Sequence, residues 1–328
     1  MTVGNVAFVV IGRNEGERLR ESLSPLLALT PRVVYVDSAS TDRSVEIARE
    51  LGAIAVVLDR SALLSAARGR NEGFGEVRSR FPDCDYVHFI DGDCVIAPGW
   101  LETAVAFLDA NPKAAVACGR RFERFPDASM YNRLCDEEWD TPVGKADHSG
   151  GDALVRVTAF EQVSGFRSDL KAGEEPEMTS RMRAQGWEIW RLDARMTEHD
   201  AKILHFGQWW KRMIRGGFGF AEVWSSTGQL PQRVFGSQLR SAFTWTIVIP
   251  LLIVLAAIFF SDSRLLFFIP VVFALQIARI AARRGFTLHA WQSAALLVVA
   301  KIPEAVGALS YFLGKKADRL VDYKAVPQ

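Results

Sequence analysis

Cysteine is scarce in this sequence, and neither sign of charge is in surplus. The 328 residues include 39 Lys and Arg against 38 Asp and Glu, so the formal net charge at pH 7 is +1. A protein that mainly binds nucleic acid usually carries a basic excess, so we expect no nucleic-acid partner. The cysteines have no CxxC pairing and no framework spacing, which favours reduced thiols over disulfides; they are Cys84, Cys94, Cys118 and Cys135.

The N-terminal sequence also does not have the pattern of a signal peptide. The apolar run Val6–Ile11 is short, has no basic residue before it and leads directly into polar residues. Such a run does not resemble the longer apolar segment of a secretion signal. We therefore expect the N-terminal body to stay in the cytoplasm.

Long apolar runs are present, but only near the C-terminus. Residues 241–328 hold nine Lys or Arg and four Asp or Glu, and Ser241–Ser261 holds no charge at all. About 20 apolar residues cross a bilayer as a helix, which predicts spans at about 241–261 and 265–282. Lys301 and Glu304 interrupt the next stretch, so we expect an interfacial or re-entrant helix at about 290–313, with a third full span as the alternative. Basic residues at 279–284 and 315–324 would then both face the cytoplasm.

The body alternates strand and helix signals. Predicted strands lie at residues 6–11, 33–36, 53–58 and 86–90, and predicted helices at 15–29, 42–51 and 65–80. This alternation predicts an α/β fold, Rossmann-like, with a mostly parallel sheet and helices on both faces. We expect a catalytic domain over residues 1–204, amphipathic interfacial helices over 205–240 and a membrane domain over 241–328.

Acidic side chains follow two of the predicted strands. Asp91-Gly92-Asp93 comes after residues 86–90, and paired carboxylates there suit a divalent cation, Mn²⁺ or Mg²⁺, that bridges to phosphates. The alternative is an ordinary polar turn. Asp37 ends the second strand and is free to accept hydrogen bonds from a base or ribose, whereas the Ser, Thr and Asp residues after it also suit a helix cap.

Four segments, at residues 10–15, 36–42, 67–73 and 91–93, occur in the order and spacing of family 2 inverting glycosyltransferases, which have the GT-A fold. The chain resembles this family over about residues 5–225. The resemblance implies a UDP- or GDP-sugar donor. It assigns the donor and its metal to Arg13, Glu15, Asp37, Ser40, Arg68, Arg70, Asn71, Asp91, Gly92 and Asp93. Solvated helix positions are the alternative for Arg68 and Arg70.

The family's catalytic base maps to Glu175, with Glu in place of the usual Asp, and Glu174 is the second candidate. An inverting enzyme needs a base near the acceptor hydroxyl. The alternative is an acidic first turn that favours the helix dipole. Among other GT-A enzymes a histidine often joins the metal ligands, which points to His199, with His205 behind it.

On the acceptor side, Gly151 and Asp152 resemble a glycine-rich strand entry of the family, and a simple turn is the alternative. The segment from Gln208 is similar to the Gln-x-x-Arg-Trp element, although the order of Arg and Trp is not reproduced. Its aromatic and basic residues suit an interfacial helix that faces a lipid or sugar acceptor, with an amphipathic core helix as the alternative. The residues concerned are Gln208, Trp209, Trp210, Arg212 and Arg215.

These features together predict a metal-dependent glycosyltransferase in the cytoplasmic membrane, with its catalytic domain facing the cytoplasm. Its partners would be membrane lipid and a lipid-linked glycan or polyprenyl-phosphate acceptor, as in surface polysaccharide or glycolipid assembly. Alternatives are a processive polysaccharide synthase, a sugar-phosphate nucleotidyltransferase and an inactive membrane module that binds nucleotide-sugars. A homo-oligomer is compatible with the sequence.

Overall fold

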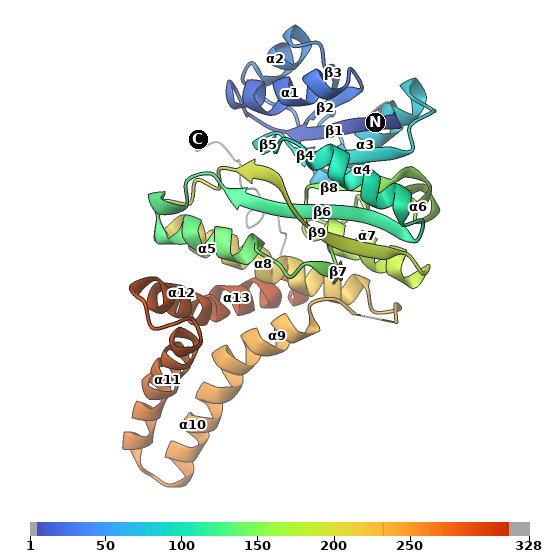
Figure 1. Cartoon of the computed structure of the whole chain (residues 1–328). Coiled ribbons are helices and arrows are strands. Elements are labelled where there is room, and N and C mark those ends of the chain that lie inside the picture. Colours follow the sequence, from blue (N-terminus) through green and yellow to red (C-terminus); the bar gives the residue numbers. More distant parts are fainter. Residues whose placement is uncertain (1–4, 232, 315–328) are drawn as a thin grey trace.

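The computed structural model describes residues 5–231 and 233–314. In this part of the chain, nine strands form one sheet in the order β3-β2-β1-β4-β8-β6-β9-β5, and β7 pairs with β9 (Figure 1). The strands are β1 Val6–Gly12, β2 Val33–Asp37, β3 Ile54–Val57, β4 Tyr86–Asp91, β5 Cys94–Ile96, β6 Ala114–Glu123, β7 Gly144–Ala146, β8 Ala153–Arg156 and β9 Glu188–His199.

The N-terminal half of the sheet is parallel, as the alternation of elements predicts. β1 pairs in parallel with β2 and with β4, and β2 pairs in parallel with β3. Helices α1 (Arg18–Leu29), α2 (Ser44–Glu50) and α3 (Ala66–Arg80) connect these strands. α3 crosses β1 so closely that a Cβ at Gly73 would lie 2.4 Å from Val9 Cγ1, which is why this turn of the helix carries glycine.

The second half of the sheet reverses direction at β8, which is antiparallel to both β4 and β6. β6 and β9 are parallel to one another. The remaining helices of the body are α4 (Trp100–Ala110), α5 (Met130–Trp139), α6 (Val157–Gln162) and α7 (Glu174–Ala184), with a short 3-10 turn, η2, at Pro126–Ala128. Because β1, β4, β6 and β9 run the same way, their carboxyl ends share one edge, on the left in Figure 1.

Below the sheet, α8 (Phe206–Ser226) leads into a set of apolar helices. These are α9 (Gly236–Phe243), a π-helical segment η3 (Thr244–Val248), α10 (Ile249–Phe259), a 3-10 turn η4 (Ser263–Phe267), α11 (Phe268–Arg283), α12 (Leu288–Val299) and α13 (Lys301–Phe312). Within the part of the chain that the structure describes, three stretches are long and apolar enough to cross a membrane: Gly236–Phe259, Ser263–Arg283 and Leu288–Phe312.

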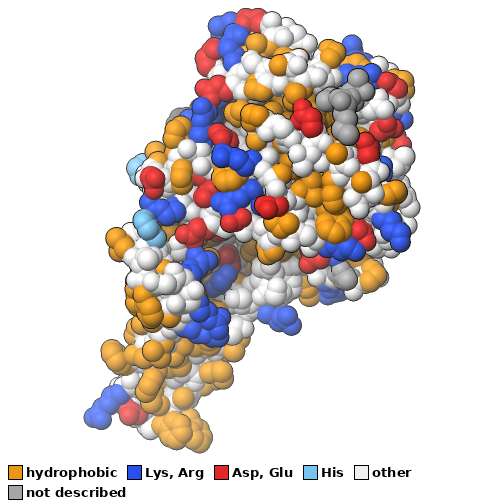
Figure 2. Space-filling view, viewed as in Figure 1, with side chains coloured by type: hydrophobic (Ala, Val, Ile, Leu, Met, Phe, Trp, Pro, Cys, Tyr) orange, Lys and Arg blue, Asp and Glu red, His pale blue; other side chains and the backbone are white. Residues whose placement is uncertain are grey.

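The first two apolar stretches form a hairpin that extends away from the body, with hydrophobic side chains over its surface (Figures 1 and 2). Only 6% of each is buried inside the protein, compared with 50% of the third. The third is docked on α8, since a Cβ at Gly307 would lie 1.9 Å from Ile214 O and one at Gly217 would lie 2.0 Å from Glu304 O. The third stretch therefore differs from the two predicted spans in being packed against the body. Its position relative to the membrane stays a prediction. The predicted basic tail at Lys315, Lys316, Arg319 and Lys324 falls outside the described residues.

Candidate active site

Two loops at the carboxyl edge of the sheet are joined by hydrogen bonds. The loop after β1 donates Asn14 N to Ser40 Oγ at 2.8 Å and Glu15 N to Ser44 Oγ at 3.0 Å. In return, Thr41 N donates to Asn14 Oδ1 at 2.8 Å. Asn14 has φ of 55°, a left-handed conformation that asparagine tolerates better than most residues. The two loops therefore form one preorganised surface.

Asp37 supports this surface from inside the protein. Its side chain is fully buried and accepts hydrogen bonds from Tyr35 OH at 3.0 Å, Ser40 N at 2.7 Å and Ser40 Oγ at 2.5 Å. Burial and the neighbouring Asp37 carboxylate raise the pKa of Tyr35, so the phenol stays a donor. In this conformation Asp37 and Ser40 bond to each other, and the direct contact with a nucleotide that the family resemblance implies stays a prediction.

The Asp-Gly-Asp turn packs against the end of β1. Glu15 is buried, accepts from Arg13 N at 3.2 Å and pairs with Arg18 at 3.1 Å. A Cβ at Gly92 would lie 3.2 Å from Ile11 O and 3.3 Å from Glu15 Cγ. Only glycine therefore fits between the two aspartates without moving the loop after β1.

Arg70 joins the donor side of the site to the proposed base helix. Its buried guanidinium donates to Asp91 Oδ1 at 2.9 Å and to Glu174 Oε1 at 2.5 Å. Burial raises the pKa of Asp91, and the Asp152 carboxylate adds to this while Arg70 opposes it. Arg70 is therefore not on a solvated helix face. In this structure its guanidinium binds two carboxylates, whereas the sequence predicts that it binds phosphate.

A second arginine, Arg121 on β6, neutralises the adjoining acids. It lies 2.7 Å from Asp152 Oδ2 and 3.5 Å from Asp91 Oδ2. Asp152 is fully buried and also accepts from Asp91 N at 3.1 Å and from Thr197 Oγ1 at 2.8 Å. Burial raises the pKa of Asp152, but Arg121 and these donors outweigh it, so the pKa is lowered overall. A Cβ at Gly151 would meet Arg70 Nη2 at 3.1 Å, so this glycine lets the loop lie over the cluster.

Asp93 and His199 form the best candidate metal site. His199 Nε2 lies 3.5 Å from Asp93 Oδ1, and both side chains are about one sixth exposed (16% and 15%). Within the described residues, His199 Nδ1 has no hydrogen-bond partner. Cys94 Sγ also belongs to this group, but burial raises its pKa well above the usual value and keeps it a thiol. A carboxylate with an imidazole fits Mn²⁺, which accepts oxygen and nitrogen ligands.

Glu175 occupies the first turn of α7 and faces the loop before β8. Its Oε1 accepts from Ser149 N at 2.7 Å and Ser149 Oγ at 2.8 Å, and its Oε2 accepts from Gly150 N at 3.0 Å. A carboxylate offers about four acceptor positions, so Oε2 retains room for one more donor. Glu174, in contrast, points to Arg70. This arrangement favours Glu175 over Glu174 as the group that can meet a hydroxyl.

Some of the predicted site residues have structural roles. Arg68 donates to Asp59 Oδ2 at 2.7 Å, and Asn71 holds the loop before α7 through Phe166 N and O, at 3.0 and 2.7 Å. Gln208 Oε1 caps the start of α8 by accepting from the backbone N of Leu204 and His205.

Trp209, which the sequence predicts on the interfacial or acceptor side of α8, does not face outward. Its side chain is fully buried and its ring stacks on Tyr131 at 6.0 Å, because α5 and the third apolar stretch cover this face of α8. Trp210 packs half-buried at the edge of the same cluster. Arg212 pairs with Glu138 of α5 at 2.8 Å, and Arg215 also has an interaction partner.

Sequence reasoning missed three residues that shape the site. Arg121 lies on a strand whose pairing partner is far along the chain, so no local motif marks it. Ser149 lies in a loop that carries no sequence motif. Glu222, on α8, is buried and accepts from Lys171 N at 2.9 Å and Ala172 N at 3.0 Å. It thereby fixes the turn into α7. An acid at an otherwise apolar position of α8 was the one available signal for Glu222.

An open sheet with helices on both faces, and an Asp-Gly-Asp turn at its carboxyl edge, define a protein of the GT-A class. Residues 7–162 match the family model described as glycosyl transferase family 2. The chain thus carries a family 2 glycosyltransferase domain, which confirms the resemblance inferred from its motifs.

Among curated proteins, the chain is similar to the succinoglycan biosynthesis protein ExoA of Rhizobium meliloti, with 29% identity over 189 residues, 54% of this chain and 55% of that protein. It is also similar to glycosyltransferase AglE of Haloferax volcanii, with 24% identity over 252 residues, 73% of this chain and 80% of that protein. The match therefore spans only about half the length of ExoA.

Two solved structures share the fold. The mannosyltransferase PcManGT from Pyrobaculum calidifontis, in complex with GDP-Man and Mn²⁺, superposes with a TM-score of 0.61 at 17% identity, covering 95% of this chain and 88% of that one. S. aureus TarS 1–349 in complex with UDP gives a TM-score of 0.50 at 16% identity, covering 95% and 92%. At these identities the likeness concerns the fold alone.

Proposed function

We propose that this protein is a membrane-anchored inverting glycosyltransferase that moves a sugar from a UDP- or GDP-sugar to a lipid-linked glycan or polyprenyl phosphate. The family 2 domain and the cluster of acids and arginines at the carboxyl edge of the sheet support this proposal. The printed names of the relatives, one a polysaccharide biosynthesis protein and one a glycosyltransferase, agree with a role in glycan assembly.

The donor would lie over the loops after β1, β2 and β4. Asp93 and His199 would hold a divalent cation, Mn²⁺ or Mg²⁺, which when bound stabilises negative charge on the diphosphate leaving group. Asp91 stays oriented by Arg70 and Arg121, and the joined loops at Asn14 and Ser40 keep their shape without the donor. Preorganised polar groups of this kind lower the cost of stabilising charge as it develops.

Glu175 acts as the general base. It accepts the proton of the acceptor hydroxyl as that oxygen bonds to the anomeric carbon, while the bond from this carbon to the diphosphate breaks on the opposite face. Ser149 and Gly150 hold the carboxylate in place through three hydrogen bonds. The resulting product has the inverted configuration, and the nucleoside diphosphate carries away the bonding electron pair.

The apolar hairpin Gly236–Arg283 supports a membrane location. The proposed cytoplasmic side for the catalytic body rests on the basic residues Arg279, Arg283 and Arg284 at the end of the hairpin next to the body. The far end of the hairpin carries Asp262 and Arg264, while Arg284 at its near end pairs with Glu137 of α5 at 2.5 Å. That ion pair ties the basic end of the hairpin to the body. A lipid-linked acceptor fits this arrangement, because the anchor keeps the site near the membrane surface.

The observation that carries the proposal is the contrast between Glu175, which Ser149 and Gly150 hold with an acceptor position left on Oε2, and Glu174, which is bound to Arg70. The test is sugar transfer or donor hydrolysis by the full chain in detergent, with UDP- and GDP-sugars, with and without Mn²⁺. We expect Glu175→Gln to keep donor binding and lose turnover by about 10²–10⁴-fold, the range for a general base, and Asp93→Asn to lose metal-dependent donor binding.

The matched control is Glu161→Gln, which removes an exposed ion pair with Arg78 on α3, away from the site. Native protein without metal-dependent nucleotide binding and without turnover on any of these donors would overturn the proposal. Turnover that survives in Glu175→Gln but not in Glu174→Gln would move the base to Glu174.

A further inference from the structure

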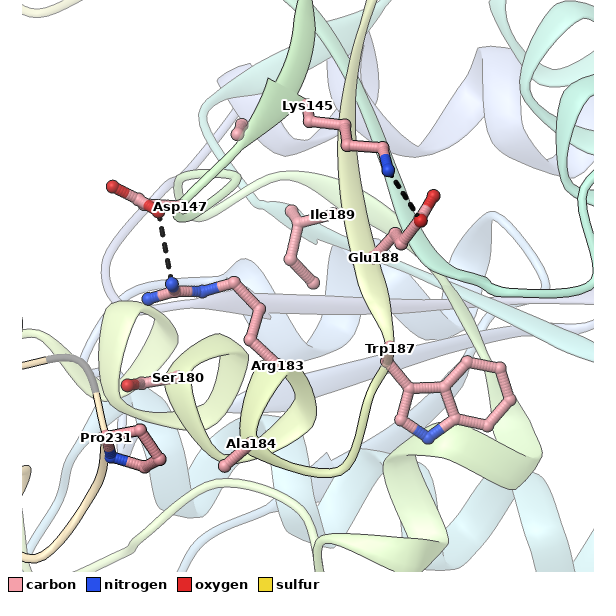
Figure 3. Close-up of a pocket in the computed structure, with 10 residues that line it drawn as sticks. Lys145, Asp147, Ser180, Arg183, Ala184, Trp187, Glu188, Ile189 and Pro231 are labelled. Atoms are coloured by element: carbon pink, nitrogen blue, oxygen red, sulfur yellow. Dashed lines mark hydrogen bonds and ion pairs between the residues drawn. The ribbon is translucent and has the colours of Figure 1, made fainter.

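A hollow lies beside the far end of α7, apart from the acids and arginines of the candidate active site. It has a volume of about 390 Å³, within the range of about 300–1,000 Å³ that small-molecule sites have. Figure 3 shows its wall, which comes from β7, from the C-terminal turns of α7 and from the start of β9. We call this feature the α7–β7 hollow. Its main lining residues are Lys145, Asp147, Ser180, Arg183, Trp187 and Glu188.

The polar groups of the hollow are arranged in two opposed ion pairs. Lys145 Nζ lies 2.6 Å from Glu188 Oε1, and Arg183 Nη1 lies 3.1 Å from Asp147 Oδ1 (Figure 3). Two cations and two anions cancel, so the hollow has no net attraction for a phosphate. It does offer both donors and acceptors, and the Lys145 and Asp147 side chains are 63% and 76% exposed. Exposed ion pairs contribute little energy and exchange partners easily.

Trp187 supplies a flat apolar surface at the rim. Its indole Nε1 donates to Gln162 Oε1 at 2.8 Å, which satisfies the polar edge and fixes the ring. The ring is half-buried, so one part packs on the core while the rest faces outward. A fixed aromatic face beside neutral sets of donors and acceptors suits a molecule with apolar CH faces and many hydroxyls, which describes a neutral saccharide.

The hollow and the proposed base share the helix α7 and the loop that faces it. Ser180 and Arg183 follow Glu175 on α7 by five and eight residues, which at 1.5 Å per residue is about 8 and 12 Å along the helix axis. In the loop after β7, Asp147 comes two residues before Ser149, the residue that donates twice to Glu175. A chain of sugars with one hydroxyl at Glu175 would therefore reach the hollow with its second or third unit.

We infer that the α7–β7 hollow is a saccharide subsite that binds the acceptor glycan one or two sugars away from the reacting hydroxyl. This rests on the proposed function, because it treats Glu175 as the base. It narrows the substrate class to acceptors that already carry neutral sugars, and it assigns Trp187 and Asp147 to acceptor binding.

The test measures binding and turnover separately. Purified full-length protein in detergent is titrated with gluco-, galacto- and manno-oligosaccharides of one, two and four units, by calorimetry. We expect the tetrasaccharide of one series to bind at least about tenfold more tightly than its monosaccharide. Trp187→Ala should remove that difference, and Asp147→Ala, a change at an exposed residue that leaves the fold intact, should reduce it severalfold. Donor hydrolysis without acceptor is measured in parallel on the wild-type protein.

Trp291→Ala is the matched control, because Trp291 is 40% exposed on α12 and remote from α7. Equal affinity for all chain lengths, or wild-type affinities in both Trp187→Ala and Asp147→Ala, would overturn the subsite, as would no binding by any saccharide at about 10 mM. Length-dependent binding by a protein that hydrolyses no donor would instead retain the hollow as a saccharide site and contradict the proposed function.

Discussion

Replacing Arg70 is the sharpest test of how the site is held together. Its guanidinium side chain is only 3% exposed and bridges Asp91 on β4 to Glu174 on α7, at 2.9 and 2.5 Å. Arg70→Met would leave both carboxylates without this cation. Removing one partner of a buried ion pair costs about 3–5 kcal/mol. We expect a loss of about 3 kcal/mol in unfolding free energy, the lower end, because Arg121 remains 3.5 Å from Asp91.

The assay is urea unfolding of the full chain in detergent, followed by tryptophan fluorescence, together with donor hydrolysis. Glu174→Gln in the Arg70→Met background should restore part of the stability, because one unpaired charge is removed with its partner. A coupling of about 1–3 kcal/mol is expected for residues in contact. Arg70→Lys should be intermediate, because one ammonium group does not bridge two carboxylates in the manner of a guanidinium. Additive losses, or full stability in Arg70→Met, would refute the bridging role.

Three further predictions concern residues away from the reacting groups. Glu222→Ala removes two charge-assisted hydrogen bonds to the turn before α7, so turnover in the hydrolysis assay should fall about 10–100-fold. Glu222→Gln should retain most of the wild-type turnover in the same assay. Gly307→Leu places a side chain where even a Cβ would lie 1.9 Å from Ile214 O, so the third apolar stretch should undock and become cleavable by protease. Gly216→Ala on α8, where a Cβ would meet nothing within 4 Å, should not have this effect. Burial lowers the pKa of His88 to about 4, and Trp100 Nε1 donates to its Nε2. Protonation therefore favours the unfolded chain, and stability should fall by about 3 kcal/mol as the pH drops from about 6.5 to 4, a slope that His88→Gln should reduce.

The sequence was sufficient for the parallel half of the sheet. Predicted strands at 6–11, 33–36 and 86–90 correspond to β1, β2 and β4, because buried parallel strands are continuous apolar runs that local pattern identifies. The three-residue strands β5 and β7 were not predicted. They are too short to show a period, and they form only because β9 provides a partner.

The sequence identified many residues of the candidate site but did not predict the contacts between them. Asp93 and His199 are 106 positions apart in the chain, yet the antiparallel pairing of β5 with β9 puts Cys94 opposite His199 and so brings the histidine to Asp93. That pairing is invisible to local patterns. The same limit applies to Trp209, whose helix has an amphipathic sequence that suits a membrane surface equally well. Its burial depends on α5 and on the third apolar stretch, both distant in the chain.

Inversion at the anomeric carbon, with Glu175 as the base, is the central claim. The direct measurement is an early-time NMR spectrum of the sugar released when the full chain hydrolyses an α-linked UDP- or GDP-sugar in the presence of Mn²⁺. The account predicts that the β-anomer forms first, before mutarotation, and that Glu175→Gln abolishes its formation. Initial release of the α-anomer, or unchanged release by Glu175→Gln, would contradict it.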